Sequence, residues 1–403
     1  MKITAKHWLA FILCAIGYIF SGTASTLLSA YLPQVISELL QRDVSQEELG
    51  DIGAYINASY LFGWMTGGLL FGIFSDRLGR KSVLGFATML AGVFTLLTAF
   101  VPDWYVLLIF RFLSGFGVGG ILLLATVYIS EIWAEKSKPV ILGILAIAFP
   151  VGIVTTGLIT SNVTNWRSCF WLAIIPIIDA ILIWLLLDES SKWRDVDKTK
   201  SVRYSAIFLP QYRINLIHGS LIFGAVLIGL WGIFSWLPTW VQTILPSGLD
   251  GNKERGISMM LLGVGGIIGG IFSGFLVKEV GNRKTLMITF LGLITMCGLL
   301  FTTNNTFTKI IYVEIVFLSL FFGLSQGALS SYIPALFPTQ IRATAVGFSF
   351  NIGRLFTASA VFFVGSLVTF FGGFAPALLS FSLLFFVAFV LAYRSPEKLA
   401  IKY

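Results

Sequence analysis

Long apolar stretches alternate with short polar ones along the whole chain. Each apolar stretch holds about 20 residues or more, and a helix of that length crosses about 30 Å of hydrocarbon. The stretches cover residues 8–37, 50–75, 82–101, 104–133, 139–163, 167–187, 215–245, 257–277, 285–303, 308–337, 343–370 and 373–393. The pattern therefore predicts an all-α membrane protein with twelve transmembrane helices.

Composition supports this prediction and excludes several function classes. Hydrophobic residues make up 57% of the chain and charged residues 11%, whereas a soluble domain has about a quarter charged residues. The net charge of +8 sits in short loops and termini, so it indicates topology and no nucleic-acid partner. The three cysteines, Cys14, Cys169 and Cys297, lack the spacing of metal ligands. No phosphate-binding loop is present, and we expect no cofactor.

The distribution of charged residues predicts the orientation. Basic residues occupy alternate loops and both termini, and the other loops are acidic or short. The basic positions are Arg77, Arg80, Lys81, Lys136, Lys138, Arg283, Lys284, Arg342, Arg394, Lys398 and Lys402. Because basic loops stay on the cytoplasmic side, we expect both termini to be cytoplasmic.

The chain repeats itself at half its length. The hairpin sequence G-I-F-S-D-R-L-G-R-K at 72–81 returns in weaker form at 274–284, and 128–133 returns at 332–337. Both matches are offset by about 200 residues, half of 403. We therefore predict two six-helix halves, 1–187 and 214–403, joined by a basic cytoplasmic linker at 188–213.

These motifs resemble the major facilitator superfamily. The hairpin 72–81 matches its G-x-x-x-D-R-x-G-R-K signature, and 111–120 resembles its R-x-x-x-G-x-G-x-G pattern. The segments 128–133 and 188–193 are similar to sugar and organic-ion porters, and 342–353 to sialate and aromatic-acid:proton symporters. The resemblance implies two pseudo-symmetric halves that rock about a central substrate site.

One departure from that branch concerns the first span. Acid symporters of this type commonly carry a D-G-x-D pattern there, but the matching stretch 17–25 reads G-Y-I-F-S-G-T-A-S. Either protons are coupled elsewhere or the protein is not a proton symporter.

Four charged residues lie at membrane depth, away from the ends of the predicted spans, where a charge needs a partner or a wet cavity. Arg354 can clamp a substrate carboxylate, or it is structural and pairs with backbone or Glu314. The resemblance implies proton coupling or a conformational relay for Arg111, and a packing ion pair is the alternative. Glu314 and Asp179 are the candidate proton acceptors. Glu314 can equally be a solvated interface residue, and Asp179 lies on a supporting span.

Polar and aromatic side chains at predicted lining positions can shape the substrate site, because they stack on rings or hydrogen-bond to hydroxyls. Packing in the core or at the interface is the alternative for each. The candidates are Tyr18, Asn57, Trp236, Gln326, Tyr332 and Asn351.

The hairpin carries the candidate gate. Asp76 can cap a facing helix and pair with a basic residue of the other half, which would latch one conformation. The alternative is that the basic residues only fix topology. The second copy has Lys278 in place of Asp76, so its latch is expected to be weaker. The candidate gating residues are Asp76, Arg77, Gly79, Arg80, Lys81, Glu131 and Arg342.

The sequence therefore predicts a secondary transporter, and not an enzyme, because no clustered catalytic set is visible. We expect a monomer in the inner membrane, surrounded by lipid, that imports a small organic anion or acidic sugar with protons. The alternatives are a neutral sugar or polyol carrier and, third, a metabolite or drug exporter.

Overall fold

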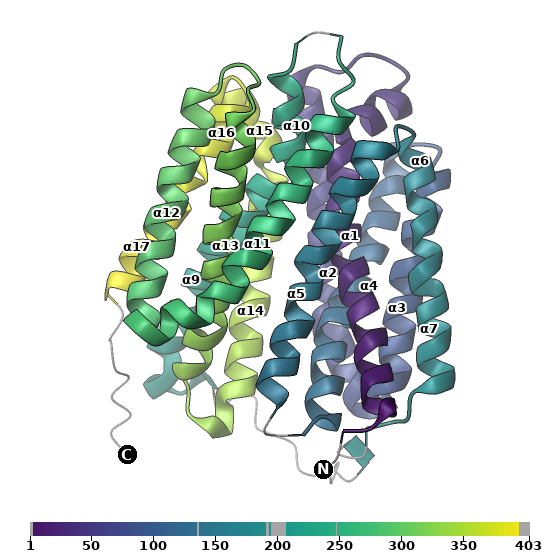
Figure 1. Ribbon diagram of the computed structural model, residues 1–403, viewed down its shortest axis with the longest axis vertical. Helices are drawn as coiled ribbons and strands as arrows, with labels where there is room; N and C mark the ends of the chain where they lie inside the picture. Colours follow the sequence, from purple (N-terminus) through teal and green to yellow (C-terminus); the bar gives the residue numbers. More distant parts are fainter. Residues whose placement is uncertain (1–2, 135–136, 191–192, 195–206, 247, 395–403) are drawn as a thin grey trace. The chain divides into compact units, whose positions relative to one another are not determined.

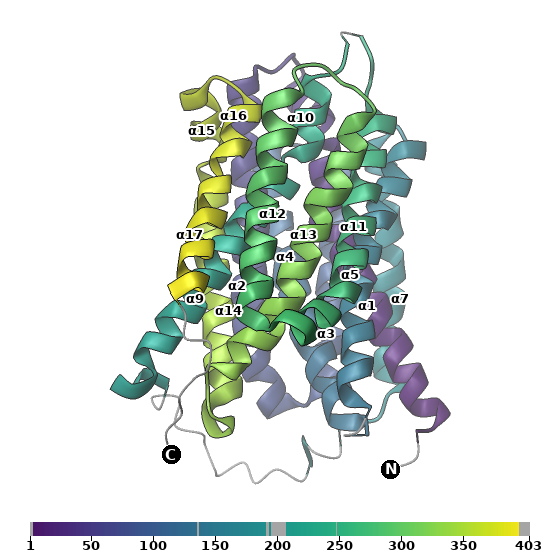
Figure 2. The same ribbon diagram turned by 60° about the vertical axis from the view of Figure 1, so that its left-hand side comes forward.

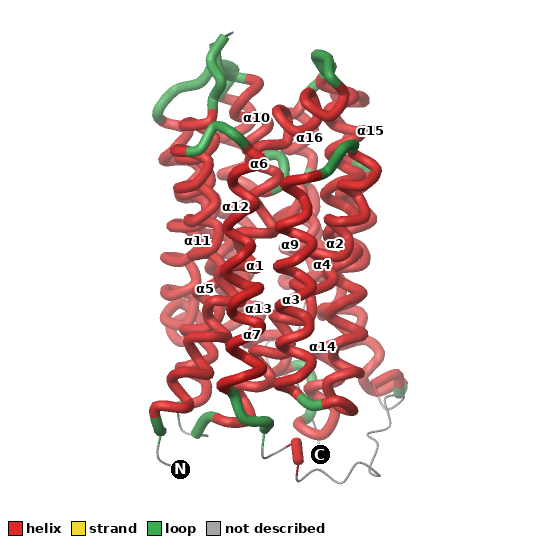
Figure 3. The backbone as a smooth tube through the Cα atoms, turned by 90° about the vertical axis from the view of Figure 1, so that its right-hand side faces the viewer, coloured by secondary structure: helices red, strands yellow, loops and turns green. Residues whose placement is uncertain are grey.

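The computed structural model describes residues 3–134, 137–190, 193–194, 207–246 and 248–394. Helices make up these residues, with short loops between them, and Figure 3 shows no strand in the described part of the chain. The described residues contain twelve helices long and apolar enough to cross a membrane. The predicted fold class, twelve transmembrane helices, is confirmed.

Each span is one long helix or a short series of helices. The first seven helices and their 3-10 extensions are α1 (Ala5–Leu40), α2 (Gln46–Leu78), α3 (Arg80–Leu97), η1 (Thr98–Phe100), α4 (Trp104–Ile132), α5 (Lys138–Asn162), α6 (Trp166–Cys169), η2 (Phe170–Ala173) and α7 (Ile174–Leu186). The later helices are α9 (Pro210–Phe234), α10 (Leu237–Thr243), α11 (Asn252–Val280), α12 (Asn282–Thr303), α13 (Ile310–Ala335), α14 (Thr339–Phe362), α15 (Val364–Phe371), α16 (Phe374–Ser380) and α17 (Ser382–Arg394). Figure 1 shows these helices with the same labels.

The chain packs as two compact units. Unit 1 contains the described residues within 1–200 together with Asn252–Met260, and unit 2 contains those within 201–251 and 261–403. The first turns of α11 thus group with unit 1, where Gln34 Nε2 donates to Asn252 Oδ1 at 3.0 Å. Most of the predicted linker, 195–206 with 191–192, lies outside the described residues. The division into six-helix halves stays a prediction.

In unit 1, α2 and α3 both pack along α4, α1 packs along α5, and α7 packs on α3 and α1. Small residues bring these backbones together, as is usual for helices in lipid. A Cβ on Gly115 of α4 would lie only 2.1 Å from the carbonyl oxygen of Tyr60 on α2. This close crossing places the polar residues of α2 directly against those of α4.

In unit 2, α9 packs along α14, and α12 lies between α13 and α17, as Figure 2 shows. Aromatic side chains fill the contacts between these helices. Phe322 of α13, for example, contacts Phe234 of α9 and Phe385 of α17 with ring centroids 5.0 and 5.4 Å apart. Such edge-on ring pairs stabilise helix packing where the hydrophobic effect gives no gain over lipid.

Candidate functional site

Arg111 is an almost fully buried cation of unit 1, with 1% of its surface exposed, the same fraction as Arg255. Its Nη1 donates to the carbonyl oxygen of Ala24 on α1 at 3.0 Å, and its guanidinium lies 4.0 Å above the ring of Tyr60. Its Nε and Nη2 have no acceptor among the described residues. A cation held by one carbonyl and a ring face keeps a net positive potential within the span.

Hydroxyl and amide groups of α1 and α2 extend from Tyr60, whose ring lies against Arg111. Tyr60 shares a hydrogen bond of 2.9 Å with Ser25, and Ser29 donates to Asn57 Oδ1 at 3.1 Å. The Nδ2 of Asn57 has no acceptor within the part of the chain that the structure describes. Ser25 and Ser29 lie one turn apart on α1, and Asn57 and Tyr60 lie one turn apart on α2. The cluster therefore presents hydrogen-bond donors that lack anionic partners.

Tyr18 lies farther along α1 and ties that helix to α4. Its hydroxyl donates to the carbonyl oxygen of Leu122 at 2.9 Å and also contacts the hydroxyl of Thr126. The structure thus gives this predicted lining residue a contact between two helices of unit 1, and a role toward substrate stays a prediction.

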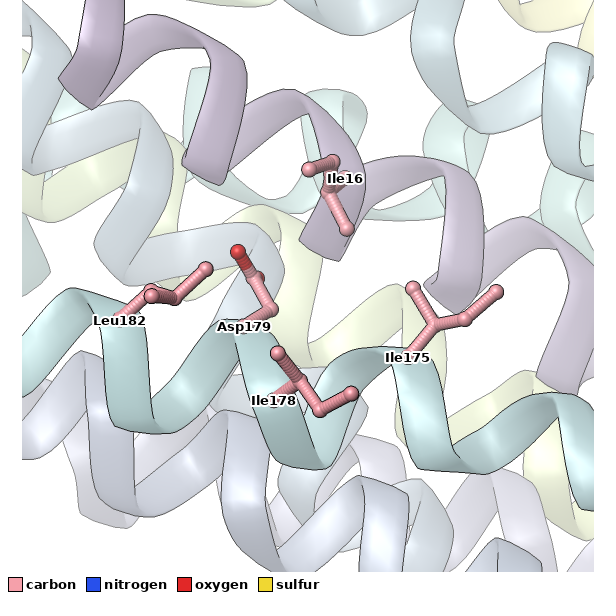
Figure 4. A pocket seen from close by; sticks show the side chains of 5 residues that line it. All are labelled: Ile16, Ile175, Ile178, Asp179 and Leu182. Carbon is pink, nitrogen blue, oxygen red and sulfur yellow. The ribbon is translucent and has the colours of Figure 1, made fainter.

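Asp179 lies on α7 and is 1% exposed. Figure 4 shows its carboxyl group pointing from α7 toward α1, beside Ile16, in a small crevice that Ile175, Ile178 and Leu182 also line. Neither carboxylate oxygen has a hydrogen-bond partner among the described residues. This acid differs sharply from Glu314, which lies near the start of α13 and accepts a bond of 2.6 Å from Asn304 Nδ2.

Unit 2 holds the remaining candidates for substrate contact. Arg354 is half-buried in the middle of α14, and its Nη1 donates to Asn351 Oδ1 one turn earlier at 3.4 Å. Trp236 is fully buried between α9 and α10, where it stacks on Phe374 at 5.4 Å. Gln326 and Tyr332 both lie on α13. Arg354 and Asn351 are thus joined by a hydrogen bond on one face of α14.

The hairpin between α2 and α3 is held by its own Asp76 and by charges from two other places in unit 1. Arg80 Nη1 donates to Asp76 Oδ1 at 2.6 Å and to Ser75 Oγ at 2.7 Å, and Arg80 Nε donates to Glu131 Oε1 at 3.1 Å. Glu189, just after α7, accepts from the backbone amides of Arg80 and Lys81 at 2.8 and 3.0 Å. These amides form the positive end of α3, where an anion is stabilising.

The sequence reasoning missed the part played by Glu189. The carboxylate on the first amides of α3 belongs to Glu189, and Asp76 pairs with Arg80 four residues later. The cap that Asp76 can form on a facing helix stays a prediction. The acidic pair directly after the sixth span, 188–189, was the available signal. The remaining gating candidates are less engaged: Arg77 is exposed, and Arg342 Nε donates to the carbonyl oxygen of Phe337 at 3.2 Å. The gating role of the set stays a prediction.

Comparison with known proteins decides the family. A model of the Major Facilitator Superfamily matches residues 14–361. The chain belongs to this superfamily. The transporter is 25% identical over 383 residues to the cis,cis-muconate transport protein of Acinetobacter baylyi, covering 91% of this chain and 89% of that protein. It is 27% identical over 354 residues to a sialic acid transporter of Escherichia coli, covering 84% and 82%.

The fold comparison agrees. The crystal structure of a D-xylose-proton symporter superposes with a TM-score of 0.80 at 16% identity, covering 98% of this chain and 99% of that one. The predicted superfamily and the resemblance to its sialate and aromatic-acid branch are confirmed. This transporter is a multi-pass membrane protein and not an enzyme.

Proposed function

We propose that the transporter carries a small organic carboxylate into the cell together with a proton, as a monomer in the inner membrane with both termini cytoplasmic. The observation that carries the proposal is the Arg111 cluster, a buried guanidinium with two N–H groups that find no acceptor in the described residues. An uncompensated positive charge within a span favours an anionic cargo over a neutral one. Relatives that match over most of their length carry muconate and sialic acid, both carboxylates.

Arg354 is the proposed ligand of the carboxylate. Arg111 is almost fully enclosed, so a dissolved anion does not reach it in this conformation, whereas Arg354 is partly accessible. A guanidinium binds a carboxylate with two parallel hydrogen bonds, and the amide of Asn351 one turn away can accept or donate a further bond. Arg111 then has a different role: through its contacts with α1 and α2 it couples the binding of substrate to the change of conformation.

Ligand-dependent thermal stability tests the substrate class. Purified protein is heated with cis,cis-muconate, sialic acid, benzoate, xylose or a polyol at two pH values. A ligand present at about 100 times its Kd stabilises the native state by about 2.7 kcal/mol. We expect the carboxylates to raise Tm and the neutral compounds to leave it unchanged.

Variants of Arg354 test whether this residue binds the carboxylate of the substrate. We expect Arg354→Ala to abolish the carboxylate shift and Arg354→Lys, which keeps the charge without the fork, to weaken it. Arg394→Ala, which removes an exposed cation at the end of α17, is the control and should keep the shift. A neutral-sugar shift that persists in Arg354→Ala would overturn the proposal and favour a sugar carrier.

A further inference from the structure

Asp179 of α7 lies beside the part of the first span in which acid symporters commonly carry an aspartate. The stretch 17–25 of α1 contains no carboxylate. Asp179 of α7 faces the first residue of this stretch, because a Cβ built on Gly17 would lie 3.9 Å from Asp179 Oδ2. The same Cβ would lie 3.0 Å from Ile121 Cγ2 of α4, so the glycine lets the side chains of α4 and α7 approach α1 closely at this point.

The surroundings of Asp179 are apolar. The crevice is lined by Ile16 of α1 and by Ile175, Ile178 and Leu182 of α7, as Figure 4 shows. Neither oxygen of the carboxyl group accepts a hydrogen bond from any described residue. Placing an unpaired carboxylate in such surroundings costs several kcal/mol, whereas the neutral acid carries no such cost. The group is therefore stable there with a proton bound.

Few other ionisable groups face Asp179. From α1, the thiol of Cys14 interacts with it electrostatically, and Tyr18 lies one residue after Gly17. From α3, the residues between Ser82 and Leu97 include no ionisable side chain. On α4, Arg111 contacts α1 at Ala24, seven residues or about 10 Å of helix rise away from Gly17. No cation among these groups is placed to hold Asp179 in its charged form.

We infer that Asp179 binds the proton that moves with the substrate. The inference rests on the proposed proton symport and names the group that performs it. The proton comes from water on one side, forms an O–H bond at the carboxyl group of Asp179, and returns to water on the other side when the conformation changes. No bond of the substrate changes. Because Asp179 and Arg111 both contact α1, this helix links the proton site to the buried cation.

Transport by full-length protein in liposomes tests the inference. The probe is cis,cis-muconate, which carries two carboxylates and crosses bare lipid poorly. An inward gradient of about one pH unit can drive about tenfold accumulation for one proton per substrate, equal to about 1.4 kcal/mol. We expect this accumulation for the wild type and none for Asp179→Asn. Exchange of labelled for unlabelled muconate without a gradient should persist in Asp179→Asn.

Two further variants test whether the loss of accumulation is specific to the carboxyl group of Asp179. Cys14→Ala changes a buried neighbour of Asp179 without removing a carboxyl group and should keep the gradient-driven accumulation. Glu314→Gln tests the rival acid. Accumulation that persists in Asp179→Asn, or that is lost only in Glu314→Gln, overturns the inference. If the wild type exchanges muconate but does not respond to the gradient, the proposed symport fails instead.

A labelling experiment gives a readout that requires no substrate. Dicyclohexylcarbodiimide modifies protonated carboxyl groups in apolar surroundings, and mass spectrometry identifies the modified residue. We expect Asp179 of the wild type to be labelled, with labelling that falls as the pH rises. Absence of labelling at acidic pH would show that Asp179 is not held as a neutral acid and would overturn the inference, whatever the transport results.

Discussion

The two hairpins of the repeat have nearly the same backbone and different chemistry. Gly79 joins α2 to α3 with φ +102° and ψ 149°, and Gly281 joins α11 to α12 with φ +83° and ψ 162°. Only glycine adopts this region without strain. Around Gly79, carboxylates of Asp76, Glu131 and Glu189 engage Arg80 or its backbone amide. The duplicated motif thus keeps the glycine turn, whereas the charges around it differ between the two copies.

The second hairpin uses weaker contacts. Asn282, which stands at the position of Arg80, accepts a hydrogen bond of 2.6 Å from Ser331. Arg283 donates to the carbonyl oxygen of Tyr393 and lies 5.4 Å from its ring. Lys278 stands in place of Asp76, and Ala335 in place of Glu131. The first hairpin is therefore held by pairs of opposite charges. In the second hairpin, the described contacts of Asn282 and Arg283 are with a hydroxyl, a backbone carbonyl and a ring.

The largest difference in stability between the two hairpins is expected when Gly79 or Gly281 is replaced by alanine. Both substitutions introduce backbone strain of about 1–3 kcal/mol. At Gly79 the new Cβ would also lie 2.3 Å from Glu189 Oε2, whereas at Gly281 nothing lies within 4 Å. We expect Gly79→Ala to lose an additional ~1–3 kcal/mol through the displaced carboxylate, measured as a lower Tm in detergent. Equal losses in Gly79→Ala and Gly281→Ala would mean that Glu189 contributes little.

A smaller loss of stability is expected when only the negative charge of Glu189 at the N-terminus of α3 is removed. Glu189→Gln keeps an acceptor oxygen near the amides of Arg80 and Lys81 but removes the negative charge at the helix N-terminus, a change of about 0.3–1 kcal/mol. Glu279→Gln, an exposed glutamate beside Gly281, is the matched control and should leave Tm unchanged. A drop of the same size in the control would point to a general effect of net charge.

The smallest effect is expected at the neighbouring acid. A hydrogen bond and ion pair of 2.9 Å from Lys6 hold the pKa of the Asp188 carboxyl below its usual range. Stability from this pair is present above the ordinary carboxyl pKa and is lost as the pH falls through the lower folded value. Both side chains are mostly exposed, 78% and 69%, so solvent screens the pair.

Thermal unfolding of Lys6→Met across acidic and neutral pH measures this contribution. We expect its Tm to lie slightly below that of the wild type at neutral pH and to coincide with it at strongly acidic pH. A difference that grows on acidification would have the wrong sign for this pair.

The sequence alone determined the span pattern, the family and the hairpin. Twelve apolar stretches are long enough to cross a bilayer whatever their neighbours, because backbone groups in lipid must be satisfied within each helix. Gly79 and the basic residues that follow it predicted a turn outside the hydrocarbon, and the structure places α3 from Arg80 onward. These features depend on the residue types within one short segment, so they can be predicted without knowing which segments pack together.

Tertiary structure alone decided which charges have partners. The sequence showed an acidic pair after the sixth span but did not show that Glu189 of this pair accepts from the amides of α3. Sequence spacing also did not show that Arg111 lies on the ring of Tyr60, or that Asp179 faces Gly17. The partners in these pairs are 51 to 162 positions apart in the chain. Periodicity cannot assign the faces on which they meet, because the spans are apolar on nearly every side. The energetic cost of a buried charge depends on what faces it, and only the packed helices determine that.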